Sequence, residues 1–373
     1  MVWNGRRTEF LMIGCARAAI GHLSVNGPPG SRTFVYPADS MATIQSKLNS
    51  VTAGNSLVFT PGIYNFASTT ITGKSGITIW SPGVATINSA PAAGTAGAFD
   101  FSSKSNWTIR GATTSSGFIF NTTLINATSA SNFSIGNNIF NTIASNGFDG
   151  SAIRMNFATF GTVINNDFNT CLGNVLGMYN WDNITIDGNH FNACYQPISS
   201  QEPTTPNTSL GRNIIVQRNV FLLTNRACME FGPSGTGSEY YSGLTVTNNF
   251  FDNFNNTSGA SSMLPISCVG QSATNTTITN NWISRGPINA GLLSPAIEIA
   301  GDGVVSGNYI VNWGYGALTY QSGWNCHDNF IYSDGTTTYL GFVNNGAGTG
   351  TFGPETTLGS LPATPAWPTR IAW

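Results

Sequence analysis

The sequence predicts an all-β fold, a β-solenoid built as a single domain, and three observations support this prediction. A phrase in which an aliphatic stretch runs into Asn-x-Phe or Asn-x-Ile recurs, with its Asn at positions 138, 166, 189, 219, 249, 281, 308 and 329. The step between copies ranges from 21 residues (308 to 329) to 32 residues (249 to 281), which is a solenoid repeat length. Leucine-rich and helical repeats keep a nearly constant length, so the variable step favours coils of short strands joined by turns. Within a copy, as in 183–189, the residues alternate with the period of two that a strand requires.

The recurring Asn has a physical reason at the bend that follows each strand. Its short amide tolerates left-handed backbone angles, and stacked Asn amides can hydrogen-bond to the coils above and below. The Phe or Ile two positions later would then fill the interior of the stack.

The N-terminal part adds a cap and a resemblance. Residues 41–48 read as a short capping helix, and residues 57–64 (LVFTPGIY) match the first-coil phrase of a known superfamily. From Arg32 to Gly350 the chain resembles the right-handed parallel β-helix superfamily typified by pectate lyases and polygalacturonases. The resemblance implies a single-domain right-handed parallel β-helix over 32–350, with a short N-terminal capping helix that hides the open end of the stack.

The two ends of the chain are predicted to lie outside the β-helix. Residues 1–31 form either a flexible arm or a secretion signal, because Arg6 and Arg7 precede a very short apolar core at 10–14. Residues 351–373 are rich in proline and form either an extended tail packed along the helix or a linker. No stretch approaches the roughly 20 apolar residues of a membrane span.

Composition narrows the partners. Only 8% of the residues are charged, the formal net charge is −2, and no Lys follows Lys104. A surface that tracks nucleic-acid phosphates needs clustered basic residues, so nucleic acid is excluded as a partner. We expect a monomer that is secreted or on the cell surface and that has a polysaccharide as its partner.

Cys171 and Cys194 each fall five residues after the Asn of their coil. Equivalent places on adjacent coils lie about 4.7 to 4.9 Å apart, which is within the Cα range of a disulfide, roughly 4.4 to 6.8 Å. The two residues are therefore either a disulfide or part of a ladder of buried thiols.

A second strand in each coil supplies an outward-facing column of side chains. The segments 152–155, 175–178, 197–200, 228–231, 265–268, 296–299 and 317–320 each flank one outward position with apolar residues. The predicted column, in chain order, is Arg154, Gly177, Ser199, Glu230, Ser267, Glu298 and Thr319.

Two carboxylates in this column are the candidate catalytic residues. Glu230 and Glu298 lie two coils apart with Ser267 between them, so their backbones should be about 9 to 10 Å apart. Side chains that lean together would bring the carboxyl groups to roughly 6.5 to 9.5 Å, the separation of an inverting glycoside hydrolase. Glu202, one coil before Glu230, is a third candidate, either as the partner acid or as a like charge that perturbs Glu230. The alternative is that these are solvated acids that balance Arg154 or Arg226.

Further residues near the column are predicted to bind substrate. The polar set contains Arg154, Asp182, Gln201 and Asp302, of which the two Asp residues could also hold a cation. Flat rings with polar edges suit the apolar faces of sugars; the aromatic set is Tyr179, Trp181, Trp313, Tyr315 and Tyr320. No metal site and no required cofactor are predicted, although Ca²⁺ binding stays open.

Three classes of function remain. The paired Asp, Gly-His-Gly and Arg-x-Lys pattern of polygalacturonases is absent, so the resemblance assigns no family. The first choice is a hydrolase that cleaves a neutral glycan with Glu230 and Glu298 as acid and base. The alternatives are a lyase or epimerase for uronate polymers, with Arg154 as its base, and a non-catalytic glycan-binding or adhesin solenoid.

Overall fold

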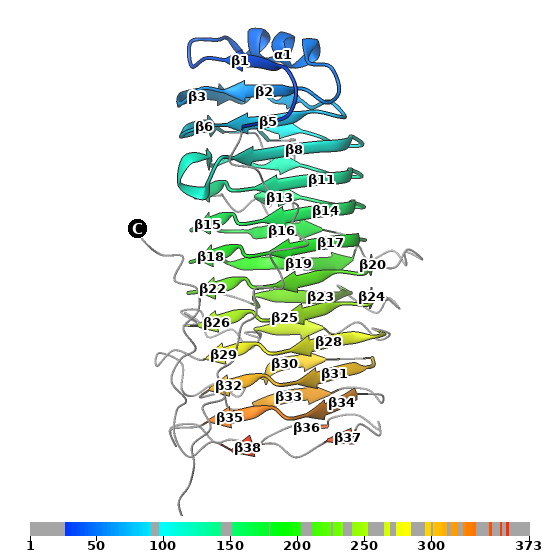
Figure 1. Cartoon of the computed structure of the whole chain (residues 1–373). Coiled ribbons are helices and arrows are strands. Elements are labelled where there is room, and N and C mark those ends of the chain that lie inside the picture. The colour runs from blue at the N-terminus through cyan, green and yellow to red at the C-terminus, as the bar shows by residue number, and fades with distance from the viewer. Residues whose placement is uncertain are drawn as a thin grey trace, which may run out of the picture.

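The chain forms one elongated stack of coils, and three parallel sheets run along its length (Figure 1). The computed structural model describes residues 27–90, 97–142, 151–178, 180–202, 211–224, 227–233, 241–252, 265–268, 274–284, 295–299, 301–311, 315–319, 324–332, 343–344, 351–352 and 356–357. Every strand-to-strand ladder between named strands is parallel, and each coil contributes its strands to the sheets in the same order. The chain is therefore a parallel β-helix, as the repeats predict.

The first sheet, sheet A, has 15 strands. Its main path contains β1 (Arg32–Val35), β2 (Ser56–Phe59), β5 (Thr78–Ser81), β8 (Ser105–Gly111), β11 (Ser131–Gly136), β14 (Thr159–Ile164), β17 (Asp182–Asp187), β21 (Ile215–Gln217), β25 (Thr245–Thr247), β28 (Thr276–Thr279), β31 (Gly303–Ser306), β34 (Trp324–His327) and β37 (Thr351–Phe352). Two short strands, β20 (Gly211–Arg212) and β24 (Tyr241–Ser242), pair beside this path.

The second sheet, sheet B, has 12 strands and follows the Asn bend of each coil. It contains β3 (Gly62–Ala67), β6 (Ala85–Ser89), β9 (Phe118–Asn121), β12 (Ile139–Asn141), β15 (Asp167–Asn169), β18 (His190–Asn192), β22 (Val220–Leu222), β26 (Phe250–Asp252), β29 (Trp282–Ser284), β32 (Tyr309–Val311), β35 (Phe330–Tyr332) and β38 (Thr356–Thr357).

The third sheet, sheet C, has nine strands and carries the predicted site. It contains β10 (Ile125–Asn126), β13 (Ile153–Arg154), β16 (Asn174–Met178), β19 (Gln196–Glu202), β23 (Met229–Pro233), β27 (Ile266–Cys268), β30 (Pro295–Ile299), β33 (Tyr315–Thr319) and β36 (Val343–Asn344). Near the N-terminal end, β4 (Ile71–Thr72) and β7 (Phe99–Asp100) pair separately. A short 3₁₀ helix, η2, spans Thr114–Ser116.

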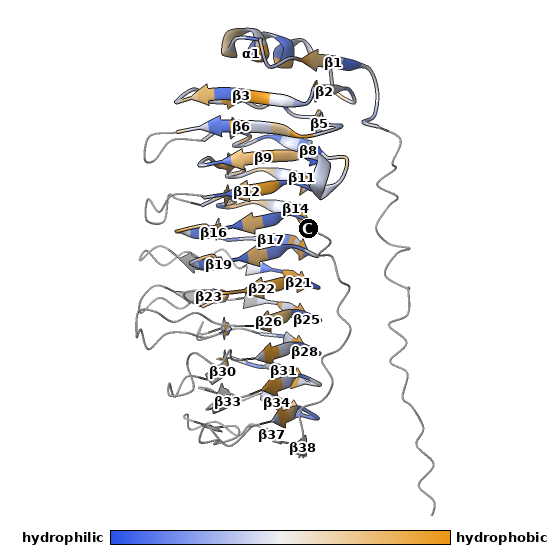
Figure 2. Cartoon of the chain, turned by 90° about the vertical axis from the view of Figure 1, so that its left-hand side faces the viewer, coloured by the Kyte–Doolittle hydropathy of each residue, from blue (hydrophilic) through white to orange (hydrophobic). Residues whose placement is uncertain are grey.

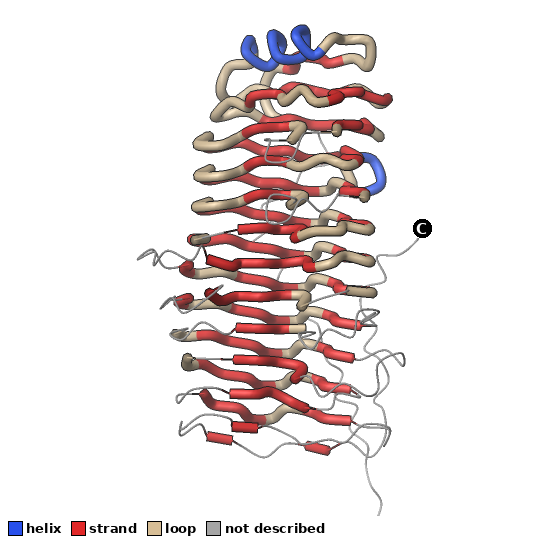
Figure 3. The backbone as a smooth tube through the Cα atoms, turned by 180° about the vertical axis from the view of Figure 1, so that it is seen from behind, coloured by secondary structure: helices blue, strands red, loops and turns tan. Residues whose placement is uncertain are grey.

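Helix α1 (Met41–Ser50) lies across the N-terminal end of the stack, which confirms the predicted cap (Figure 3). Ser40 is its N-cap, and the Ser40 side chain accepts a hydrogen bond from the Thr43 backbone N–H at 3.2 Å. Ile44 and Leu48 point into the core and are almost completely buried. The apolar face of this short helix thus shields the first coil from water.

The repeated Asn residues form a continuous buried ladder, as predicted. In a representative step, Asn166 donates from its Nδ2 to Asn189 Oδ1 at 3.0 Å, and its backbone N–H donates to the same oxygen at 2.9 Å. Asn189 repeats both bonds toward Asn219. The ladder contains Asn138, Asn166, Asn189, Asn219, Asn249, Asn281, Asn308 and Asn329, all of them buried. Each amide satisfies backbone groups at the bend that water cannot reach.

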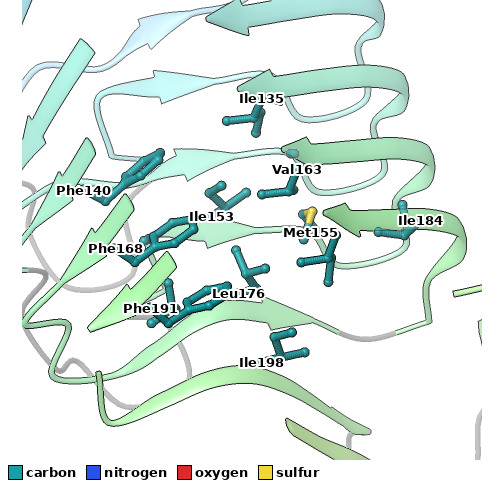
Figure 4. Packing of buried hydrophobic residues seen from close by; sticks show 14 of the residues in the cluster. Ile135, Phe140, Ile153, Met155, Val163, Phe168, Leu176, Ile184, Phe191 and Ile198 are labelled. Carbon is teal, nitrogen blue, oxygen red and sulfur yellow. The ribbon is translucent and has the colours of Figure 1, made fainter. Parts of the chain in front are cut away.

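Stacked apolar side chains fill the interior (Figure 4). The rings of Phe140, Phe168 and Phe191 stack with neighbouring centroids 4.9 Å apart, which is the spacing of adjacent coils. The stack continues through Phe221 and Phe251. Along the strands, apolar and polar residues alternate, so one face of each strand joins this core and the other lies outside (Figure 2).

Strand pairing runs from the start of β1 at Arg32 to the end of β38 at Thr357. At the C-terminal end, β37 pairs with β34 and β38 pairs with β35. Of the predicted arm or signal at 1–31, residues 1–26 lie outside the described residues, as does the part of the predicted tail at 351–373 that follows Thr357.

The cysteines favour the thiol ladder over the disulfide. Cys171 and Cys194 are both buried, and their thiols are not joined in a disulfide. The Cys194 thiol donates to the carbonyl oxygen of Phe168 at 3.4 Å. The described thiols therefore act as small core side chains.

Candidate functional site

The register of sheet C places the two predicted catalytic carboxylates in one column. Ser199 pairs with Glu230, Glu230 with Ser267, and Ser267 with Glu298. Glu230 and Glu298 are half-buried, whereas the apolar residues on either side of each point into the core and are buried. Both carboxylates thus lie on the outer face of sheet C, two coils apart.

The predicted column is wrong by one residue at its C-terminal end. Glu298 pairs with Leu318, and Thr319 pairs instead with Ile299, which lies in the interior column. A one-residue change of register exchanges the two faces of a strand, so Leu318 takes the place predicted for Thr319.

Each of the two carboxylates accepts a hydrogen bond from a buried polar side chain. The Gln196 Nε2 donates to Glu230 Oε2, and the Ser267 Oγ donates to Glu298 Oε2 at 3.1 Å. Gln196 is completely buried and Ser267 is 4% exposed. Buried partners hold a carboxylate in one orientation, which a catalytic acid or base needs.

Gln196 is the residue that the sequence reasoning missed. It begins β19, three residues before Ser199, and its buried Oε1 has no hydrogen-bond partner. The available signal was a Gln before Pro197 at the start of a strand whose next residues, to Ser200, are small or apolar.

The core behind the column is apolar. Burial first, and then the negative charge of Glu298, raise the pKa of the Cys268 thiol well above its ordinary value. The Cys268 side chain therefore stays a protonated, small hydrophobe beneath the outer face.

Glu202 and Gln201 extend the same sheet. Gln201 pairs with Gly232, and Glu202 with Pro233, three residues along the strand from the pair of Ser199 and Glu230. At about 3.3 Å per residue, the backbone of Glu202 is displaced by roughly 10 Å along the strand from that pair. Their side chains lie outside the described residues, so their predicted roles stay predictions.

Arg154 belongs to the predicted column, because it pairs with Asn126 on one side and Gly177 on the other. It is half-buried and lies three coils before Glu230, which corresponds to about 14 Å. This distance removes Arg154 from the immediate surroundings of the carboxylate pair.

Asp182 and Asp302 both lie at the turn that leads from sheet C to sheet A. Asp182 begins β17, and its Oδ1 accepts a hydrogen bond from Asn183 Nδ2 at 2.9 Å. Asp302 precedes β31, and its Oδ1 accepts the backbone N–H of Asn275 at 2.7 Å. Both side chains thus have structural partners within the turn, and binding of substrate by either stays a prediction.

The prediction that Trp181 binds substrate is wrong. Its side chain is completely buried and belongs to the core, because the residue lies on the inward face of the turn. Tyr179, Trp313 and Tyr320 lie outside the described residues, and only the backbone of Tyr315 is described.

Neither a metal cluster nor a membrane helix is found in the described part of the chain. Within the ranges given above, no three His, Cys, Asp or Glu side chains come together to hold a metal ion. No helix in those ranges is long and apolar enough to cross a membrane. Binding of Ca²⁺ stays a prediction.

Comparison with known proteins shows likeness in structure and not in sequence. No family model matches the chain, and no curated protein matches it. A tailspike protein of the E. coli bacteriophage HK620, solved in complex with a pentasaccharide, is 14% identical, with a TM-score of 0.54, over 89% of this chain and 64% of the tailspike. An exopolygalacturonase from Thermotoga maritima is 9% identical, with a TM-score of 0.52, over 88% of this chain and 93% of the enzyme.

A third structure represents a different chemistry. The A-module of a mannuronan C-5 epimerase from Azotobacter vinelandii is 12% identical, with a TM-score of 0.50, over 87% of this chain and 95% of the module. Identities this low show the fold alone, and fold does not fix the reaction. Together with the three stacked parallel sheets, these likenesses show that the chain has the right-handed parallel β-helix fold, which a hydrolase, an epimerase and a sugar-bound tailspike share.

Proposed function

We propose that the protein is a glycoside hydrolase that cleaves a neutral polysaccharide by acid/base catalysis with Glu230 and Glu298. The observation that carries the proposal is the pairing of Glu230 with Ser267 and of Ser267 with Glu298 on the outer face of one sheet. Two coil spacings separate the backbones by about 9 to 10 Å. Inclined side chains then reach the separation of roughly 6.5 to 9.5 Å that leaves room for an attacking water.

Each carboxylate is oriented by a donor. The Gln196 Nε2 donates to Glu230, and the Ser267 Oγ donates to Glu298. In the proposed mechanism one of the two carboxyl groups activates the water and the other protonates the leaving oxygen of the glycosidic bond.

The surroundings of the pair favour a neutral glycan over a uronate polymer. Ser199 and Ser267 beside the carboxylates are uncharged, and Arg154 is three coils away. The whole chain has only 14 Lys and Arg residues. A carboxylate-rich polymer beside two Glu residues would require neutralisation by cations, whereas a neutral sugar needs only hydrogen bonds. The proposal includes a monomeric protein, secreted or on the cell surface, with no required cofactor.

The test compares Glu230→Gln and Glu298→Gln with the unchanged protein on neutral and uronate polysaccharides. The matched control is Asp252→Asn, because Asp252 is a half-buried, outward acid on sheet B that accepts a hydrogen bond from Ser284. The proposal is supported if the unchanged protein and the control release saturated products with inverted anomeric configuration. Both Gln variants should fail to release them. Unsaturated products would show that the protein is a lyase. Binding of a glycan without cleavage would show that it is a glycan-binding solenoid.

A further inference from the structure

Phe157 and Phe160 occupy backbone positions that aromatic residues normally avoid. Phe157 has φ 57° and Phe160 has φ 52°, both in the left-handed region. Their side chains are 44% and 60% exposed. Among the large apolar side chains that the described residues expose, only these two lie on left-handed backbone. A bulky residue there is a true outlier, and a left-handed residue costs roughly 1–2 kcal/mol. Neither ring recovers this cost by burial in the core.

Among the described residues, Phe160 interrupts a column of left-handed positions that are otherwise Asn or Gly. The register of sheet A aligns Phe160 with Asn132 on one side and Asn183 on the other. The same column contains Gly76, Asn106, Asn132, Asn183, Asn213, Gly243 and Asn275, all with positive φ.

The Asn residues in this column also bond to one another. Asn132 Nδ2 donates to Asn106 Oδ1 at 2.5 Å, and Asn213 Nδ2 donates to Asn183 Oδ1 at 3.1 Å. Phe160 separates these two runs of amides. It therefore adds backbone strain, exposes a ring and replaces a ladder amide, three costs that stability alone does not explain.

Phe157 lies in the same coil, in the turn between β13 and β14. The turn closes with a hydrogen bond from the Ala158 N–H to the Met155 carbonyl at 3.1 Å. Equivalent turns in the two preceding coils place Ser103 and Ser129 at this position, also with left-handed φ. Small polar residues thus hold both positions in the neighbouring coils, and among the described residues at these positions only Phe157 and Phe160 are aromatic.

On the preceding coil, the residues next to the two rings are polar and uncharged. Ser129 and Asn132 flank them there, so amide and hydroxyl groups surround an exposed aromatic surface. Rings suit the C–H faces of sugars, and neutral amides and hydroxyls suit sugar hydroxyl groups. A protein interface would bury a broader apolar patch, whereas two rings three positions apart in the chain match a single saccharide chain.

We propose that Phe157 and Phe160 form a sugar-binding platform for the polysaccharide, at a distance from the catalytic pair. The inference rests on the proposed function. Arg154 lies in the same coil, three residues before Phe157, in the column that leads to Glu230. Phe157 is therefore about 14 Å from Glu230 along the axis and roughly 10 Å along the strand direction. A platform at this distance binds only chains of several sugar units.

Substitutions that copy the neighbouring coils test the platform. Phe160→Asn and Phe157→Ser install the residues that the adjacent coils carry at these positions. We expect their melting temperatures to rise or stay unchanged, because the strain is relieved. We also expect binding of long glycans to weaken by about tenfold, as for the loss of one aromatic contact. A purely structural role for the rings predicts the opposite, a lower melting temperature with unchanged binding.

The binding measurement is separate from catalysis. Retention of the Glu230→Gln protein in gels that contain a soluble xylan, galactan, glucan or uronate polymer is compared with and without each Phe substitution. Phe34→Ser is the matched control, since Phe34 is 42% exposed on β1 near the cap and far from the column. Weaker retention in both platform variants, but not in the control, supports the platform even if no glycan is cut.

Three results would overturn the platform. The first is unchanged retention of the Phe157→Ser and Phe160→Asn variants, which would refute the platform even if the Glu pair proves to be catalytic. The second is absence of retention of the Glu230→Gln protein on every polymer. The third is a change of oligomeric state in the Phe variants during sedimentation, which would reassign the rings to self-association.

Discussion

Replacing Asn219 by alanine removes a side chain that serves neighbouring coils on both sides. Its Nδ2 donates to the carbonyl oxygens of Ile186 and Gln217 and to Asn249 Oδ1, each at 3.0 Å. Its Oδ1 accepts the backbone N–H of Asn189 at 2.9 Å and the Asn189 Nδ2 at 3.0 Å. The side chain is completely buried, so no water replaces these bonds.

The expected loss follows from these contacts. A net contribution of about 1 kcal/mol per hydrogen bond gives about 5 kcal/mol for the five bonds, as an upper value. Asn189 Nδ2 keeps two other acceptors, Val163 O and Asp187 O, so part of the loss is recovered. We expect the free energy of unfolding to fall by roughly 3–5 kcal/mol, which includes the penalty for the orphaned Asn189 N–H.

The matched control is Asn141→Ala, in a second amide ladder on the outer face of sheet B. Asn141 donates to Asn121 Oδ1 at 3.3 Å and accepts from Asn169 Nδ2 at 3.2 Å, and it is half-buried. Water can replace both bonds, so we expect a loss of about 1 kcal/mol or less. Reversible urea unfolding, followed by circular dichroism and fluorescence, measures both variants. Losses that agree within about 1 kcal/mol would refute the assigned role of the buried ladder.

Three further predictions concern the core and the titratable groups. Phe221→Ala should lower the free energy of unfolding by about 3–5 kcal/mol in the same assay, since it empties one place in the ring stack; a loss below about 1 kcal/mol would contradict tight stacking. Burial lowers the pKa of His190 from 6.5. Between pH 6.5 and the lower native pKa, the unfolded chain binds a proton at His190 that the folded chain does not. The free energy of unfolding should therefore fall as the pH drops below about 6.5. His190→Gln should flatten this pH dependence, and an unchanged slope would assign it to other groups. Cys171 and Cys194 should react with a thiol reagent only in denaturant and without prior reduction; a requirement for reductant would show a disulfide.

Much of the fold could be predicted because its cause is local and repeated. From Asn138 onward, an Asn at the bend and a Phe or Ile two positions later mark each coil, and the ladder and the core stack form at those residues. The second strand of each coil was also predictable from alternation, and this placed Glu230 and Glu298 on the outer face. The capping helix was predicted over 41–48 and is found at Met41–Ser50.

The errors arose where the chain alone contains no register information. Thr319 and Leu318 are both compatible with the alternation of β33, and only pairing with β30 decides between them. Trp181 was misplaced because aromatic residues in turns can point either way, and here the ring enters the core.

The sequence by itself determined the architecture and the outward placement of the Glu pair, because a period of two and a recurring bend residue act within one coil. Only the tertiary structure decided which residues act on those carboxylates and which positions are strained. The contact of Gln196 with Glu230 joins residues 34 apart, and the exceptional position of Phe160 is visible only beside Asn132 and Asn183. Contacts between coils depend on the lengths of the intervening turns, and those lengths vary from coil to coil, so stacking rather than local sequence brings these residues together.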